Sequence, residues 1–152
     1  MSHVTTGEMC ITDLGDVEKA AEALGGKLVR GQKTHKWFGV FLDDWQDERA
    51  AVKRGIDAAT FGTCDHAIVL QDAAKDDYEV GLVKRRDGKG WDAIYDTFGA
   101  YGRRLEDKLG KGLSKLKTEC GIHATKRTYA ELGYMVEEGQ NDQGRRQVRV
   151  WK

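Results

Sequence analysis

Two short cysteine–histidine pairs are the part of this chain with the most potential chemistry. Cys64 and His66 lie two positions apart in an apolar stretch, and Cys120 and His123 lie three apart in a helical stretch. Either spacing places the two side chains on one face of their element. Two cysteines and two histidines could bind zinc tetrahedrally, but neither pair has zinc-ribbon spacing. We therefore predict no metal and no cofactor, and keep a Cys/His metal-dependent enzyme as a third hypothesis.

Motifs for covalent catalysis and phosphate binding are weak. The cysteines at 10, 64 and 120 are not placed at a helix N-terminus, which would lower the pKa of a thiol. The stretch LGKGLSKLK contains Gly, Lys and Ser but lacks the spacing of a phosphate-binding loop. The sequence therefore predicts no catalytic residue and favours a protein that is not an enzyme.

Basic residues recur close to aromatic ones and form the candidate binding surface. Arginine can contact phosphate with two parallel hydrogen bonds, and an aromatic ring can stack on a base. Taken one by one, these basic clusters are typical of solvated surface, and the order of the strands decides whether they converge. The candidate residues are Lys84, Arg85, Arg86, Trp91, Tyr95, Arg103 and Arg104.

The composition limits the class of protein. The 152 residues suit one domain, and 25 basic residues balance 25 acidic ones, so no long-range field draws the chain to nucleic acid. Three widely spaced cysteines make a poor disulfide framework and indicate a reducing compartment. No apolar run approaches the roughly 20 residues that span a bilayer. We expect a soluble cytoplasmic protein without a membrane partner, and a homo-oligomer stays open.

Hydrophobic periodicity predicts the elements that must position these residues. Residues 3–12 predict a first strand, and a helix follows whose apolar side chains repeat on one face, with Thr12 or Asp13 as its cap and Gly25 at its end. Alternating residues around the turn DGKG predict a hairpin over 78–96. A further helix is expected as an insertion over 43–62. Acidic residues lie near its N-terminal end, and Trp45, Val52 and Ile56 share one apolar face.

The last third of the sequence predicts a long helical region and a second hairpin. Leucines recur at three- and four-residue steps from 101 to 132, and glycines at 110 and 112 predict a break. The turn NDQG predicts a hairpin that ends in RRQVRVW. Hairpins outnumber parallel crossovers, which favours a single α+β domain over 1–152, an antiparallel sheet with helices on one face. A ferredoxin-like plan, or two fused half-units of one, is the expected arrangement.

Several segments together resemble a known family. They are MSH before the first strand, DLGDVEKAAEALG, YEVGLVKRRDGKGWDAIYDTFG, YAELGYMVEE and the closing VRVWK. This order is similar to domain-of-unknown-function family 1257, typified by a hypothetical chloroplast and cyanobacterial reading frame. The resemblance covers most of the chain except the segment 43–62. It implies a small accessory protein encoded near AAA-type ATPases, and it adds Ser2 and His3 to the candidate site residues.

Three hypotheses follow from the sequence. The first is a non-enzymatic binding or adaptor protein that presents a sheet edge or a basic-aromatic face to a protein partner, with an ATPase as the partner that the resemblance implies. The second is a phage-type protein that sequesters a small anionic or nucleotide-like ligand. The third is the Cys/His metal-dependent enzyme.

Overall fold

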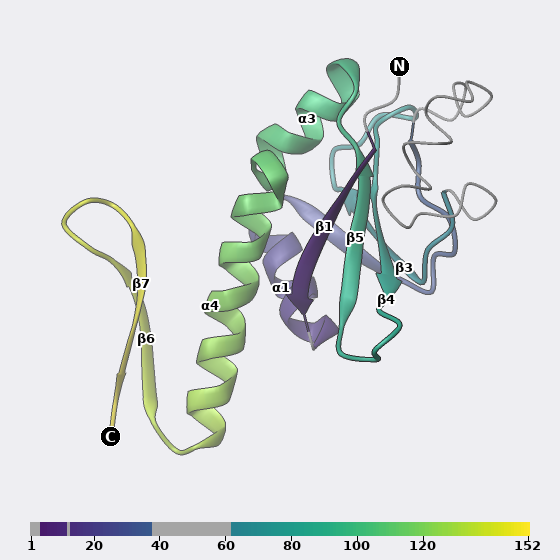
Figure 1. The fold of residues 1–152 in the computed structure, drawn as a ribbon. Coiled ribbons are helices and arrows are strands. Elements are labelled where there is room, and N and C mark those ends of the chain that lie inside the picture. Colours follow the sequence, from purple (N-terminus) through teal and green to yellow (C-terminus); the bar gives the residue numbers. More distant parts are fainter. Residues whose placement is uncertain (1–3, 12, 38–61) are drawn as a thin grey trace.

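A five-stranded antiparallel sheet forms the body of the protein (Figure 1). The computed structural model describes residues 4–11, 13–37 and 62–152. Ser2, His3 and nearly all of the predicted helical insertion at 43–62 lie outside the described residues. The elements are β1 Val4–Ile11, α1 Leu14–Ala23, β2 Gly26–Arg30, β3 His66–Leu70, β4 Val80–Lys84, β5 Trp91–Asp96, α3 Gly99–Leu109, the 3₁₀ turn η3 Lys111–Leu113, α4 Ser114–Glu131, β6 Met135–Gln140 and β7 Arg146–Trp151.

The strands lie in the order β1-β5-β4-β3-β2, and every neighbouring pair is antiparallel. Helix α1 therefore connects the two edge strands, and β2 to β5 return across the sheet as a meander. This confirms the α+β class. The ferredoxin-like order is not confirmed, because that plan returns a strand to the same sheet after its second helix. Among the described strands, β6 and β7 instead form a separate two-stranded sheet.

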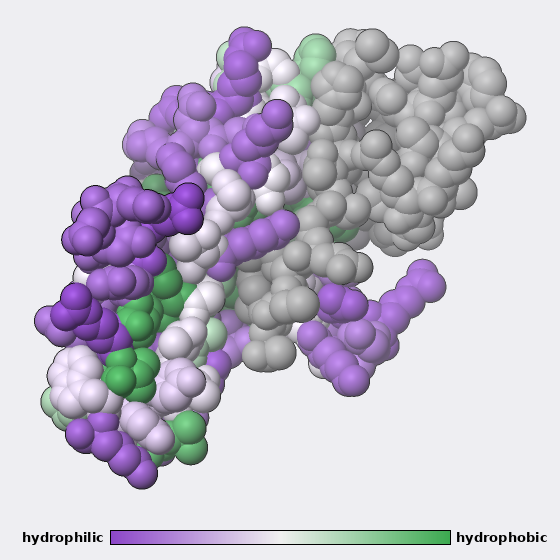
Figure 2. All heavy atoms as spheres, turned by 60° about the vertical axis from the view of Figure 1, so that its left-hand side comes forward, coloured by the Kyte–Doolittle hydropathy of each residue, from purple (hydrophilic) through white to green (hydrophobic). Residues whose placement is uncertain are grey.

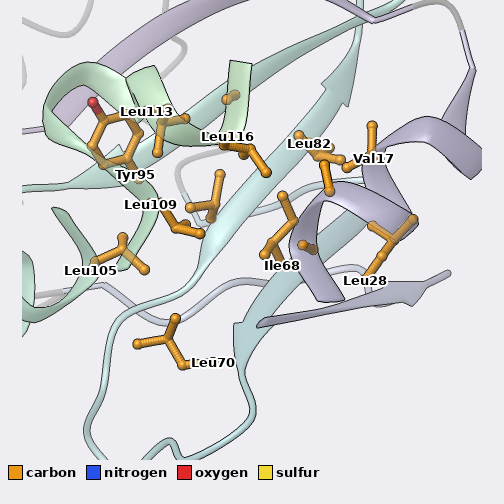
Figure 3. Packing of buried hydrophobic residues seen from close by; sticks show 14 of the residues in the cluster. Val17, Leu28, Ile68, Leu70, Leu82, Tyr95, Leu105, Leu109, Leu113 and Leu116 are labelled. Atoms are coloured by element: carbon orange, nitrogen blue, oxygen red, sulfur yellow. The ribbon is translucent and has the colours of Figure 1, made fainter. Parts of the chain in front are cut away.

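The core lies between one face of the sheet and the helices. Strand positions alternate with period two, so Ile68, Leu82 and Tyr95 point to the same face. Leu105, Leu109 and Leu116 enter the same cluster from the helices, and Figure 3 shows these side chains directed at one another. Each is 1 % exposed or less, and burying one such side chain stabilises the fold by about 1.5–3 kcal/mol.

Helix α1 begins directly after its predicted cap residue Asp13, and an ion pair links it to α4. The Asp13 carboxylate accepts a hydrogen bond from the Gly15 N–H at 2.7 Å, which satisfies a free donor of the first turn. Asp16, two residues into α1, is 5 % exposed and accepts two hydrogen bonds from the Arg127 guanidinium. Such a two-bond contact fixes orientation as well as charge, so it sets the position of α1 along α4.

The predicted break in the C-terminal helical region is confirmed. Gly110 and Gly112 both have positive φ, which an L residue adopts at a cost. A Cβ atom on Gly110 would lie 2.5 Å from the Lys115 backbone nitrogen, so only glycine allows the chain to turn this tightly. Leu113 also has positive φ, at 60°, yet it is fully buried. Packing of its side chain therefore holds a backbone conformation that leucine rarely adopts.

The second face of the sheet is covered over β4 by the segment that follows β2. His35 is 5 % exposed, and a Cβ atom on Gly81 would lie 2.5 Å from its Nδ1. Among the described residues, neither ring nitrogen has a hydrogen-bond partner. Burial lowers the pKa of His35 to about 4, while the nearby Asp96 opposes that shift. The imidazole is therefore neutral at physiological pH and packs as an uncharged ring against β4.

Candidate functional site

The β6–β7 hairpin stands beside α4 and away from the five-stranded sheet (Figure 1). Its strands are in simple register, with Met135 opposite Trp151 and Glu137 opposite Arg149. Val136, Val148 and Val150 are half-buried, whereas Met135, Glu137, Arg149 and Trp151 are exposed. The alternation defines two faces: an inner face toward α4 and an outer face that is open to solvent.

Ion pairs hold the inner face of the hairpin on α4. Glu138 of β6 pairs with Lys126 of α4 at 3.1 Å and with Arg146 of β7. Arg146 also pairs with Glu119 of α4, a carboxylate that is 6 % exposed. His123 Nε2 lies 3.8 Å from Glu119 Oε2. Burial lowers the pKa of His123, with Lys126 and Lys19 adding to the effect and Asp16 opposing it. Ion pairs on the inner face therefore hold the hairpin on α4, while its outer face stays exposed to solvent.

Large apolar side chains are exposed where the hairpin joins α4. Leu132 is 63 % exposed, Met135 60 %, Trp151 45 % and Tyr129 39 %. We call these four residues the hairpin patch. Figure 2 brings this side of the molecule forward and shows apolar residues gathered in its lower left part. Single exposed apolar residues are ordinary, but several of them at the junction of a helix end and a hairpin are typical of an interaction surface.

The sequence-predicted basic tip lies at the β4–β5 turn. Lys84 and Arg86 are exposed, and Arg85 pairs with Asp87 at 3.4 Å within the turn. Trp91 begins β5 and is half-buried, with its ring against His66 at a centroid distance of 6.2 Å. The three cations therefore form a small exposed group whose nearest aromatic ring already has a partner.

The remaining predicted site residues lie at the other end of β5. Arg104 pairs with Asp72 and Asp77, both at 3.3 Å, and Arg103 is exposed on α3. Tyr95 is 1 % exposed in the core, and burial together with Glu106 raises the pKa of its hydroxyl. A strand of this length spans roughly 17–20 Å. The structure thus separates the predicted basic-aromatic residues into two groups instead of one surface, and His3 lies outside the described residues.

The described thiols are held in their neutral form. Burial raises the pKa of Cys64 to about 11 and that of Cys120 to about 12. The Cys64 thiol donates to the Gln32 carbonyl, and His66 Nδ1 accepts the Gly31 N–H at 2.9 Å. Within the part of the chain that the structure describes, no three His, Cys, Asp or Glu side chains come together as metal ligands. These contacts occupy the Cys64 thiol and the Nδ1 nitrogen of His66.

A hollow of about 340 Å³ lies where the hairpin, α4 and the end of α1 meet. Its lining residues are Leu24, Ser114, Lys115, Thr118, Glu119 and Arg146. Lys115 donates to the Asp107 carbonyl, and Arg146 is engaged by two carboxylates. The carboxylates of Glu119 and Glu138 balance the positive charges of Lys115 and Arg146, which makes this hollow a poor anion site.

Comparison of the chain with family models, with curated proteins and with solved structures finds no match. No helix among the described residues is both long enough and apolar enough to cross a bilayer.

Sequence reasoning placed the second hairpin correctly but did not single out the hairpin patch. The sequence feature that could have revealed this patch is a break in the alternation of apolar and polar residues. Tyr134, Met135 and Val136 are three consecutive apolar residues, and Val150 is followed directly by Trp151. A strand that buries only one face should alternate apolar with polar residues. Consecutive apolar residues indicate that both faces of this hairpin are apolar near its base.

Proposed function

We propose that this protein is a non-enzymatic adaptor that binds a protein partner through the hairpin patch. The observation that supports it is the exposure of Met135 and Trp151 on a hairpin that contributes nothing to the main core cluster, together with the exposure of Leu132 at the end of α4. A two-stranded sheet is at best marginally stable alone, and here α4 supports its inner face while the outer face stays open. Aromatic and methionine side chains are enriched in protein interfaces.

The resemblance to domain-of-unknown-function family 1257 suggests an AAA-type ATPase as the partner. Sequestration of a small anionic ligand is the weaker alternative, since Arg146 beside the hollow is already paired with two carboxylates, one of which also lines it. A thermal-shift screen with nucleotides separates the two, because a ligand that binds the native state raises its stability. The adaptor hypothesis expects no nucleotide-dependent shift.

A variant of the hairpin patch tests the adaptor hypothesis. Leu132→Gln, Met135→Thr and Trp151→Thr together remove apolar surface while threonine keeps the β-propensity of the strands. Because all three side chains are exposed, we expect an unchanged circular dichroism spectrum and at least about a tenfold loss of the captured partner. The measurement is affinity capture from the source cells with tagged protein, quantified by mass spectrometry.

The matched control is the triple variant Lys84→Ala, Arg85→Ala and Arg86→Ala, which removes exposed charge from the other hairpin of the chain. We expect it to capture the partner as the parent protein does. If the hairpin-patch variant kept the partner and the control variant lost it, the proposal would be wrong and the binding surface would lie at the β4–β5 turn.

A further inference from the structure

We propose that the outer face of the β6–β7 hairpin binds the same face of a second copy of this chain around a two-fold axis parallel to the strands. This inference rests on the proposed function, because it uses Met135 and Trp151 of the hairpin patch. It goes further by naming the partner. The register of the hairpin and the chemistry of its cross-strand pairs make this face self-complementary.

The outer face consists of three rows, each made of one residue from β6 and its partner from β7. Met135 with Trp151 makes an apolar row, Glu137 with Arg149 makes a charged row, and Gly139 with Gln147 makes a small polar row. The apolar row and the charged row each pair two chemically complementary residues. Within the described residues, neither Glu137 nor Arg149 forms an ion pair, so both charges are available to a partner.

A two-fold axis along the strands places each row opposite the same row of the second copy. Rotation about this axis keeps the direction of the strands and places β6 of one copy over β7 of the other. Met135 then faces Trp151 of the second copy, and Glu137 faces Arg149 of the second copy, each contact occurring twice. Complementary charges that meet in this way set the register and suppress wrong partners.

Pairing through strand edges fits less well. If the middle of β6 paired with the middle of β6 of a second copy in antiparallel fashion, Glu137 or Glu138 would lie directly opposite the same residue of the other chain. Like charges directly opposite each other destabilise a strand pair. The sequence of β6 therefore disfavours edge pairing and leaves the outer face as the self-complementary surface.

The size of this face sets the expected strength. Stable interfaces bury about 800 Å² per partner, and three rows of two residues cover less. We therefore expect a dimer that forms with increasing protein concentration, between about 10 µM and about 1 mM, as weak interfaces do. At low concentration the same face remains available to other partners.

Charge exchange in the middle row tests the proposal. Sedimentation equilibrium over that concentration range is expected to give a monomer–dimer equilibrium for the parent chain. Glu137→Arg alone and Arg149→Glu alone each place like charges across the two-fold axis, so we expect dimerisation to weaken at least about tenfold. The double variant Glu137→Arg with Arg149→Glu restores opposite charges and is expected to dimerise as the parent does.

Mixing the two single variants gives the decisive result. One chain then presents two positive charges in the middle row and the other presents two negative charges, so the mixture is expected to form a heterodimer although each variant alone is monomeric. This rescue cannot come from a folding defect, because both chains carry their substitution. A mixture that stays monomeric, or single variants that dimerise as the parent does, would overturn the proposal.

The result also separates this proposal from the adaptor hypothesis. A parent chain that is monomeric at every concentration overturns the second-copy inference. Loss of captured protein from the hairpin-patch variant would still support the adaptor role in that case. Concentration-dependent dimerisation with rescue by mixing supports the inference whatever the capture experiment gives.

Discussion

Replacing Gly102 by alanine is expected to lower the free energy of unfolding by about 3 kcal/mol or more, because the added methyl group meets backbone. A Cβ atom at this position would lie 2.2 Å from the carbonyl carbon of Thr97 and 2.4 Å from its oxygen. Gly102 is buried in α3, where the helix crosses the end of the β5–α3 connection. Neither backbone can move without shifting Asp96, which is fully buried at the end of β5.

Gly121→Ala is the matched control for this prediction. Gly121 also lies within a helix, but nothing lies within 4 Å of a Cβ atom added there. Alanine should therefore stabilise α4 by up to about 1 kcal/mol, the usual difference between the two residues inside a helix. Urea unfolding of both variants gives the comparison. If Gly102→Ala were stabilising as well, the close approach of α3 to Thr97 would be wrong.

The second large effect is a loss of stability in acid that originates at His35. The pKa of His35 is lowered to about 4 in the folded protein from an ordinary value of 6.5. The unfolded chain therefore binds the proton more readily, so stability is full above about pH 6.5, falls as the pH is lowered and levels off below about pH 4. A difference of this size corresponds to about 3 kcal/mol.

His35→Gln removes the titrating ring from this site while keeping a polar side chain of similar length. We expect the stability of the variant to differ less between about pH 7 and about pH 4.5 than that of the parent protein, by about 2–3 kcal/mol in urea unfolding. His66→Gln controls for the loss of a histidine from the half-buried end of β3. An unchanged pH dependence in His35→Gln would mean that the acid-sensitive group lies elsewhere.

The elements of this fold could be predicted from the sequence because their signals are local. Asp13 caps α1 through a hydrogen bond to the second residue that follows it, and Gly110 with Gly112 breaks the helical region by backbone geometry. Both hairpins follow from alternation around short turns. Each of these features depends on residues that are close in sequence, so a single sequence contains the information.

Strand order depends on contacts between distant residues and could not be predicted in this way. Lys84 pairs with Trp91 at the start of β5 and Arg103 follows the end of that strand, so the two lie at different ends of β5. The expected basic-aromatic surface was built from residue types alone, and it included Tyr95, which the core buries. The hairpin patch had a signal in the consecutive apolar residues of β6, but its exposure depends on how far the hairpin stands from the sheet.

The position of β1 has a consequence for the order of folding. β1 pairs with β5, from Val4 opposite Asp96 to Ile11 opposite Trp91. Strands β2, β3 and β4 all lie between these two strands in the sequence. Loop closure of that length is entropically slow, whereas β3, β4 and β5 form from neighbouring segments. We expect β1 to join last, so nascent chains pass through a state in which the edge of β5 is open. Unpaired edges template aggregation, and docking of β1 is the step that removes this hazard.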